Sequence, residues 1–213
     1  MSQVLIVDDH ELVAEALALG LRARGVAAVT VRPAEFLDRV AEPAPPGGLV
    51  LLDLDLGAAV EGVDGADLVP RLRRAGWRVL LITGSTDETR IAVAIAGGAL
   101  GRVPKSAPFD ELVDAAARAA EGRSLTSEAE RRRLHAVAAA ADTQARARRD
   151  RWRRLTPREL QIVERIAAGK RPAAIAEEFV VSVATVRTQI KSISAKLEVS
   201  SQLEIAALAR ELI

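Results

Sequence analysis

The sequence predicts an α/β domain with a doubly wound, five-stranded parallel sheet, followed by a small all-α domain of four helices. Short apolar runs alternate with helical patterns through residue 122, and from Thr156 onward the pattern is helical throughout. Such alternation is typical of a parallel sheet that is covered by helices on both faces. A length of 213 residues also exceeds the usual size of one domain. We therefore divide the chain into domains at 1–122 and 151–213, joined by a linker at 123–150.

The predicted strands of the first domain are short apolar runs. Segments between them carry apolar residues at helical spacing, and a glycine stands where each of several helices should stop. A turn at 43–48 precedes the third strand, and a glycine-rich loop at 57–65 follows it. The strands are expected at VLIV (4–7), AAVTV (27–31), LVLL (49–52), VLLI (79–82) and GRVP (101–104), and the helix stops at Gly25, Gly76, Gly97 and Gly122.

The linker and the second domain are predicted to be helical. Residues 123–150 are rich in Ala, Arg and Glu, which favours a helical linker over a flexible one. Thr156, Pro157 and Glu159 form a helix start with an N-cap, a proline in the first turn and a capping-box glutamate. Three further helices follow a break at Gly169: a short one around 175–179, one at 183–197 and a final one at about 201–212.

Composition excludes several classes of protein. The chain has no cysteine, so it has neither disulfides nor thiolate metal sites. It has no apolar run long enough to span a membrane, and its N-terminus, MSQVLIVDDH, does not resemble a signal peptide, so we expect a cytoplasmic protein without a membrane partner. Residues 1–122 are acidic and the remainder is basic, which suits a cation site in the first part and a polyanion partner in the second.

Polar side chains follow four of the five predicted strands. Asp8 and Asp9 follow the first strand, Asp53 ends the third, Thr83 ends the fourth and Lys105 follows the fifth. Carboxyl ends of parallel strands share one edge of a sheet, so these side chains should converge in one crevice. Clustered carboxylates favour a hard divalent cation, of which Mg²⁺ is the natural candidate, and Asp53 would then be placed to accept a phosphoryl group.

Each of these residues also has an ordinary interpretation. The aspartates can be solvated strand ends or turn residues, the threonine a helix N-cap and the lysine a surface charge. Five matching positions at the same edge favour a site. His10, beside the acidic pair, is expected to have a local or solvent-facing role.

The motifs VLIVDDH, LVLLDLDLG, LLITGS and GRVPKS resemble those of the receiver domains of two-component response regulators, over residues 2–122. The resemblance implies a flavodoxin-like strand order, a bound Mg²⁺ ion and a sensor histidine kinase as partner. It further implies that the domain catalyses its own phosphorylation and dephosphorylation without being an enzyme in another sense. By the same resemblance Asp53 is the phosphorylated residue, Asp8 and Asp9 surround the metal, Asp55 contributes its backbone carbonyl, and Thr83 and Lys105 sense the phosphate.

Three positions depart from the family pattern. Arg102 stands three residues before the lysine, where an aromatic switch residue is usual, and Gly84 follows the threonine where alanine is common. Leu56 and a longer loop replace the usual Met-Pro after the phosphoacceptor. The phosphoryl chemistry is expected to be retained, while the switch that reports it is expected to differ.

The helix predicted at 183–197 has the features of a DNA-recognition helix. Apolar residues recur along it at spacings of three and four, namely Val186, Ile190, Ile193 and Leu197, and should face the core. Arg187, Thr188 and Lys191 lie elsewhere on the helix and can donate hydrogen bonds to base edges in the major groove. Ser182 should cap the helix, and Thr185 and Lys196 are placed for phosphates. The alternative is a solvated basic face on a small helical bundle.

LTPRE, IAEEF, SVATVRTQIKSISAKL and the closing ALA resemble the four-helix output domain of the NarL/LuxR family, over nearly all of 152–213. That resemblance implies transcription regulation, binding to double-stranded DNA as a homodimer on paired half-sites, and a dimer contact through the final helix. The stretch KRPAAIA (170–176) departs from the Asn-Lys-Glu that the family often has.

The sequence thus predicts a transcriptional regulator controlled by aspartyl phosphorylation. One alternative keeps DNA binding but places control with a ligand, a partner or abundance. Another is a phosphotransfer or signalling adaptor that does not bind DNA.

Overall fold

The structure is a computed structural model that describes residues 3–40, 43–56 and 64–212. It consists of two compact units, Met1–Ala141 and Asp142–Ile213, which are treated separately below. The glycine-rich loop expected at 57–65 lies outside the described residues, except for its last two positions.

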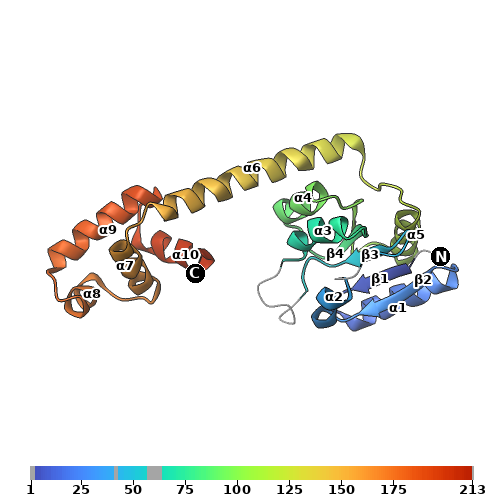
Figure 1. The fold of residues 1–213 in the computed structure, drawn as a ribbon, viewed down its shortest axis with the longest axis horizontal. Coiled ribbons are helices and arrows are strands. Elements are labelled where there is room, and N and C mark those ends of the chain that lie inside the picture. Colours follow the sequence, from blue (N-terminus) through green and yellow to red (C-terminus); the bar gives the residue numbers. More distant parts are fainter. Residues whose placement is uncertain (1–2, 41–42, 57–63, 213) are drawn as a thin grey trace. The chain divides into compact units, whose positions relative to one another are not determined.

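The first unit is built on a parallel, five-stranded sheet (Figure 1). Its strand order is β2-β1-β3-β4-β5, the flavodoxin-like order, so the predicted fold is confirmed. The strand bounds differ from the expected ones by one residue at most. They are β1 (Gln3–Val7), β2 (Ala27–Val31), β3 (Leu49–Leu52), β4 (Arg78–Thr83) and β5 (Arg102–Pro104).

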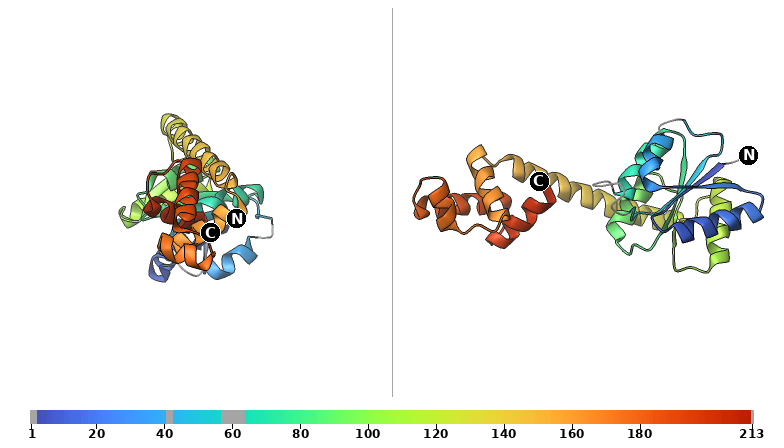
Figure 2. Two further views of the ribbon diagram at one scale, coloured as in Figure 1. Left: turned by 90° about the vertical axis from the view of Figure 1, so that its left-hand side faces the viewer. Right: turned by 90° about the horizontal axis from the view of Figure 1, so that it is seen from below.

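Helices cover both faces of this sheet because the buried strands are apolar on both sides. On β1, Val4 and Ile6 pack with α1 and α5, whereas Leu5 and Val7 belong to the core formed with α2, α3 and α4. Figure 2 shows helices on either side of the strands. The helix bounds are α1 (Glu11–Ala23), α2 (Pro33–Arg39), α3 (Gly65–Arg74), α4 (Glu88–Ala96) and α5 (Phe109–Ala120).

Strand register brings the sites at the strand ends together. Val7 of β1 pairs with Leu52 of β3, and the backbone N–H of Asp53 donates to the Val7 carbonyl at 3.0 Å. On the other side of the sheet, Thr83 pairs with Pro104, directly before Lys105. The crevice predicted from the sequence is therefore set by backbone pairing.

The expected helical linker is a single helix, α6 (Glu128–Arg153), within which the division between the two units falls. Ser127 accepts a hydrogen bond from the backbone N–H of Glu130 and so satisfies one free donor of the first turn. Leu134 and Ala138 are buried in the core that contains α3 and α4. The start of the linker is thus packed onto the first unit.

The second unit contains the four expected helices, α7 (Pro157–Ala167), α8 (Pro172–Glu178), α9 (Val183–Leu197) and α10 (Gln202–Leu212). Thr156 and Glu159 form the predicted capping box, and Ser182 caps α9 by accepting from the Thr185 backbone N–H. The four apolar residues of α9 named above are all buried in the core of this unit, as predicted. No helix in the described part of the chain is long and apolar enough to cross a membrane.

Candidate functional site

An acidic cluster lies at the carboxyl ends of β1 and β3. Asp8 and Asp53 are buried, with 6% and 2% of their surface exposed, whereas Asp9 and His10 are exposed. One ligand atom from each of these four residues lies within 4.8 Å of all the others. The structure therefore brings together three carboxylates that the sequence placed at one sheet edge, and adds an imidazole to them.

Lys105 reaches into this cluster from the end of β5. Its Nζ donates to Asp53 Oδ2 at 2.6 Å and to Asp8 Oδ1 at 2.7 Å. Burial lowers the pKa of Lys105, but the hydrogen bonds to Asp53 and Asp8 outweigh that effect, so the pKa lies above its usual value. Lysine is thus held in its charged form between two buried carboxylates.

Thr83 is fully buried at the end of β4, and its hydroxyl accepts a hydrogen bond from the Ser85 backbone N–H at 3.1 Å. The wall opposite is closed by Gly65, at the start of α3. A Cβ on that glycine would lie 2.6 Å from the Asp53 carbonyl oxygen, so only glycine allows α3 to approach this closely. The start of α3 is therefore packed directly against the backbone of Asp53 and Leu54.

His10 forms local contacts on the open side of the cluster. Its Nδ1 lies 2.7 Å from Asp9 Oδ1 and 3.3 Å from Asp8 Oδ1, while its side chain is 67% exposed. The backbone N–H of His10 donates to Asp8 Oδ1 at 2.8 Å. These contacts help to orient Asp8 and place the imidazole at the rim.

Arg90, on α4, is a part of this region that the sequence analysis missed. Its guanidinium donates to Asp64, to the Asp55 carboxylate at 2.6 Å and to the Leu54 carbonyl at 2.8 Å. The side chain of Asp55 is thereby occupied outside the cluster, which leaves its backbone carbonyl as the group it can offer to a metal. Nothing in the local sequence around Arg90 signals these contacts, because its partners lie 26 to 36 residues away.

The donor set fits a hard divalent cation. Carboxylate and carbonyl oxygens are the ligands that Mg²⁺ prefers, and Asp8, Asp9 and Asp53 supply three carboxylates within one ion's reach. Among the residues that the structure describes, one lysine, Lys105, lies within hydrogen-bonding distance of these carboxylates. The excess of negative charge is the physical reason that a cation would bind here.

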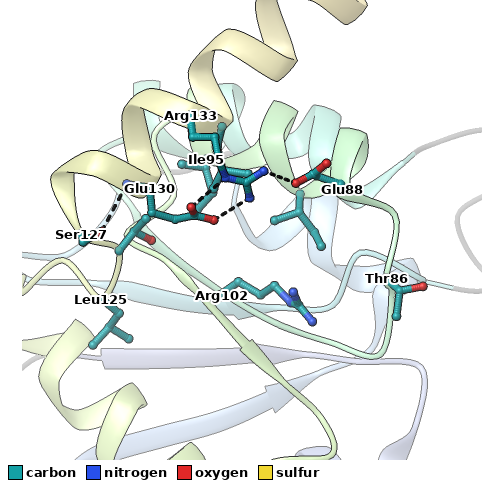
Figure 3. Close-up of a pocket in the computed structure, with 11 residues that line it drawn as sticks. Thr86, Glu88, Ile95, Arg102, Leu125, Ser127, Glu130 and Arg133 are labelled. Atoms are coloured by element: carbon teal, nitrogen blue, oxygen red, sulfur yellow. Dashed lines mark hydrogen bonds and ion pairs between the residues drawn. The ribbon is translucent and has the colours of Figure 1, made fainter.

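Arg102, which stands at the position of the usual aromatic switch residue, is exposed. Within the described residues its side chain makes no hydrogen bond or ion pair, and it lines a cavity formed with α4 and the start of α6 (Figure 3). Thr83 and Lys105 are therefore part of the acidic cluster's surroundings, whereas Arg102 belongs to a separate cavity.

The predicted recognition helix, α9, presents its polar residues to solvent. Arg187, Thr188 and Lys191 are all exposed, and no ion pair of Arg187 or Lys191 is present among the described residues. The Thr188 hydroxyl donates to the Ala184 carbonyl at 3.0 Å. Ser182 and Thr185 are also exposed, at the first turn.

Lys196 has a partner within the second unit. Its Nζ donates to Glu159 Oε2 at 2.7 Å, and Ser192 Oγ donates to Glu159 Oε1 at 2.8 Å. Burial raises the pKa of Glu159, but the bonds from Lys196, the Thr156 backbone and Ser192 bring it down to about 2. The sequence indicated the capping role of Glu159 but not this link between α7 and α9.

Two family models match the chain. The response regulator receiver domain matches residues 4–117, and the bacterial regulatory proteins of the luxR family match residues 153–209. The first match contains the acidic cluster and Lys105, and the second contains α9.

Curated relatives match over nearly their whole length. The transcriptional regulatory protein LiaR of Bacillus subtilis (strain 168) is 29% identical over 98% of this chain and 97% of its own. The transcriptional activator protein ExaE of Pseudomonas putida is 30% identical over 98% and 95%. The nitrate/nitrite response regulator protein NarL of Escherichia coli (strain K12) is 29% identical over 95% and 92%.

Among solved structures, RcsB from Salmonella enterica serovar Typhimurium, bound to promoter P1flhDC in the presence of the phosphomimetic BeF₃⁻, covers 100% of this chain and 99% of its own. The identity is 22% and the TM-score 0.51, so this likeness shows the fold. The order of the two matched domains, the acidic cluster and the four helices of the second unit agree with these matches: the chain belongs to the NarL-type response regulators, which are DNA-binding transcription regulators rather than enzymes.

Proposed function

We propose that Asp53 accepts a phosphoryl group from a sensor histidine kinase and that this modification controls DNA binding through α9. One observation carries the proposal: a buried carboxylate, 2% exposed, is held by Lys105 at 2.6 Å inside a cluster with two further aspartates. Asp53 is thus held in a fixed position, and its cluster carries more negative charge than Lys105 balances. A metal ion and a phosphoryl group bound there would change that charge balance.

The transfer would require little more than positioning. An Asp53 carboxylate oxygen forms a bond to phosphorus while the P–N bond of the kinase phosphohistidine breaks, and the electron pair returns to the imidazole nitrogen. Lys105, freed from part of its contact with the carboxylate, would donate to a phosphoryl oxygen, and the Thr83 hydroxyl would turn from the Ser85 N–H toward another. These are contacts that differ between the two states, as a switch requires.

Asp8, Asp9, Asp53 and the backbone carbonyl of Asp55 would hold the Mg²⁺ ion. When bound, Mg²⁺ supplies positive charge for the phosphoryl oxygens. The carboxylates of Asp8 and Asp9 would hold the ion in place, and Lys105 would neutralise the negative charge of the cluster that the ion does not balance.

The α9 helix would enter the major groove of double-stranded DNA. Arg187 and Lys191, exposed and without ion pairs among the described residues, would reach base edges together with Thr188. Thr185 and Ser182, at the first turn, are placed for phosphate contacts. Lys196 was also expected to reach phosphate, but its bond to Glu159 assigns it first to holding α9 against α7.

A second copy of the chain is the partner that we assign to α1. Leu12 and Leu19 lie seven residues apart on one face of α1 and are 88% and 69% exposed. Exposed apolar side chains that share one face are typical of an interaction surface. Glu15 lies toward the start of one flank of this face and Arg22 toward its end, so two copies packed antiparallel would match opposite charges. Leu203 on α10, 78% exposed, offers the second contact, through the final helix.

We propose that the protein acts in the cytoplasm, which its membership of a family of DNA-binding regulators supports. For its domains, we keep a receiver at 1–122, a linker at 123–150 and an output domain at 151–213, with the first turns of the linker packed on the receiver. An adaptor that does not bind DNA is not supported, because the luxR-family match covers α7 to α9 and most of α10.

Fluorescence anisotropy on a DNA site selected from a random library tests the proposal. Binding is measured with and without Mg²⁺ plus a small phosphodonor, for the wild type, Asp53→Asn and Arg187→Ala. We expect treatment to tighten DNA binding of the wild type and of Arg187→Ala but not of Asp53→Asn. In each condition Arg187→Ala should bind about fivefold or more weakly than the wild type, since one bidentate base contact contributes about 1–3 kcal/mol. Equal affinity of the wild type and Asp53→Asn under all conditions would overturn phosphate control while leaving DNA binding intact.

A second candidate, control of the same DNA binding by a ligand or partner, is favoured by one observation. Arg102 occupies the switch position but lines a cavity to which neither Thr83 nor Lys105 contributes. Tight DNA binding that is independent of Asp53 would favour this candidate.

A further inference from the structure

A cavity of about 560 Å³ opens in the first unit between α4, β5 and the start of α6. Its size falls within the range of sites that hold small molecules. Figure 3 shows side chains from all three elements around it, with Arg102 extending into the space from β5. None of its lining residues belongs to the acidic cluster.

The charges around the cavity are unequally paired. Arg133, on α6, donates to Glu88 and also holds both carboxylate oxygens of Glu130, at 2.7 and 2.8 Å. The two acidic groups of the cavity are therefore occupied by one arginine. Arg102 is left with no hydrogen bond or ion pair in the described part of the chain, although five N–H donors in a fixed fork are available to it.

The other residues that line the cavity include threonines with free hydroxyls among the described residues and several apolar side chains. The hydroxyls of Thr86 and Thr126 make no hydrogen bonds within the described ranges, and both residues line the cavity. Ile91, Ile95 and Leu134 form the buried apolar part of its wall. Unpaired donors beside an apolar wall are the features of a pocket that orients a ligand by its polar end.

We propose that this cavity is a binding site for a small organic oxyanion, whose carboxylate or phosphate group is held by Arg102 and whose apolar part lies against α4 and α6. A bidentate guanidinium contact fits both head groups. The cavity shares no lining residue with the acidic cluster, so the proposal does not rest on phosphorylation of Asp53. Because Leu134 and Arg133 belong to α6, a bound anion also contacts the start of the linker.

The first experiment uses 8-anilinonaphthalene-1-sulfonate, an aromatic sulfonate, titrated into the full chain without Mg²⁺. We expect saturable binding that Arg102→Gln weakens about tenfold or more and Arg102→Lys weakens less. Arg71→Gln is the matched control, since Arg71 is an exposed arginine of α3 without an ion pair among the described residues, and it should leave the affinity unchanged. Circular dichroism melts show that each variant is folded.

Two further arms separate head group from apolar contact. N-phenyl-1-naphthylamine, which lacks the sulfonate, should bind the wild type and Arg102→Gln alike. Octanoate and octyl phosphate should displace the sulfonate probe, and the stronger competitor identifies the head group. Amide chemical-shift changes on probe binding should cluster at Thr86, Arg102 and Thr126. The proposal is overturned if Arg102→Gln binds the probe as tightly as the wild type, if neither competitor displaces it, or if the shifts cluster elsewhere.

Discussion

In each unit a lysine donates to a buried carboxylate, and the Lys105–Asp53 and Lys196–Glu159 pairs are nearly identical in isolation. Asp53 and Glu159 are 2% and 3% exposed. Their carboxylates accept from Lys105 and Lys196 at 2.6 and 2.7 Å. Burial and a short ion pair therefore do not distinguish a reactive group from a structural one.

The surroundings of the two pairs distinguish them. Both oxygens of each carboxylate accept a hydrogen bond, those of Asp53 from Lys105 and, at 3.2 Å, from the Asp55 backbone N–H. Glu159 accepts from the Thr156 backbone N–H at 2.7 Å and from Ser192 at 2.8 Å besides Lys196, and one lysine balances one carboxylate. Lys105, in contrast, is shared between Asp53 and Asp8. Asp9 adds a third carboxylate. A carboxylate whose charge is balanced and whose oxygens are hydrogen-bonded stabilises the fold. Uncompensated negative charge at a solvent-accessible site favours binding of a cation, and the bound cation can then hold a phosphoryl group.

The largest difference is expected in phosphoryl uptake. Asp53→Asn should abolish the gain of one phosphoryl group after incubation with Mg²⁺ and a small phosphodonor, because the amide offers no nucleophilic oxygen of comparable charge. Glu159→Gln should be modified as fully as the wild type. Intact-protein mass spectrometry measures both, and modification of Asp53→Asn to the wild-type extent would assign the phosphoacceptor to another residue.

Stability should show the reverse pattern. Glu159→Ala removes the capping box and the bonds to Lys196 and Ser192, and should destabilise the second unit by about 2–3 kcal/mol. Hydrogen exchange of peptides from α7 and α9 in the full chain measures this loss, with peptides from β1 and β3 as the internal control. Equal protection in α9 of both proteins would contradict a structural role for this network.

The pH dependence of the second unit follows from the same carboxylate. Because the folded-state pKa of Glu159 is lowered to about 2, its stabilisation is fully present above its ordinary pKa of 4.5 and is lost as the pH falls toward 2. Between pH 4.5 and about 2 the free energy of unfolding of the wild type should fall as Glu159 is protonated. Glu159→Gln has no carboxylate at this position, so its free energy of unfolding should not change for this reason. Urea unfolding of the Trp77→Phe background, in which Trp152 is the remaining tryptophan, measures the difference by fluorescence at several pH values, and the difference should close at low pH.

The smallest expected effect concerns metal affinity. Lys105→Gln removes a positive charge from between Asp8 and Asp53 and should tighten Mg²⁺ binding by about fivefold, on the order of 1 kcal/mol for one charge near a partly solvated site. Lys196→Gln is the matched variant and should leave Mg²⁺ affinity unchanged. Isothermal titration calorimetry measures both, and weaker binding by Lys105→Gln would show that the lysine organises the carboxylates more than it competes with the ion.

The sequence by itself determined the strands, their order along the chain and the edge at which the polar residues meet. Continuous apolar runs that alternate with helical patterns are typical of a covered parallel sheet, and Asp8 and Asp53 each stand directly after such a run, while Lys105 follows the short fifth strand. The same holds for Thr156 and Ser182, because capping depends on neighbours a few residues away.

Only the tertiary structure decided which of these charges are already paired. Arg90 meets Asp55 and Asp64, and Lys196 meets Glu159, across 26 to 37 residues, so no local pattern could reveal them. The separation of Arg102 from the acidic cluster likewise depends on how α4 and the start of α6 surround it. Secondary structure follows from short-range periodicity, whereas the partner of a long, charged side chain depends on which distant elements pack beside it.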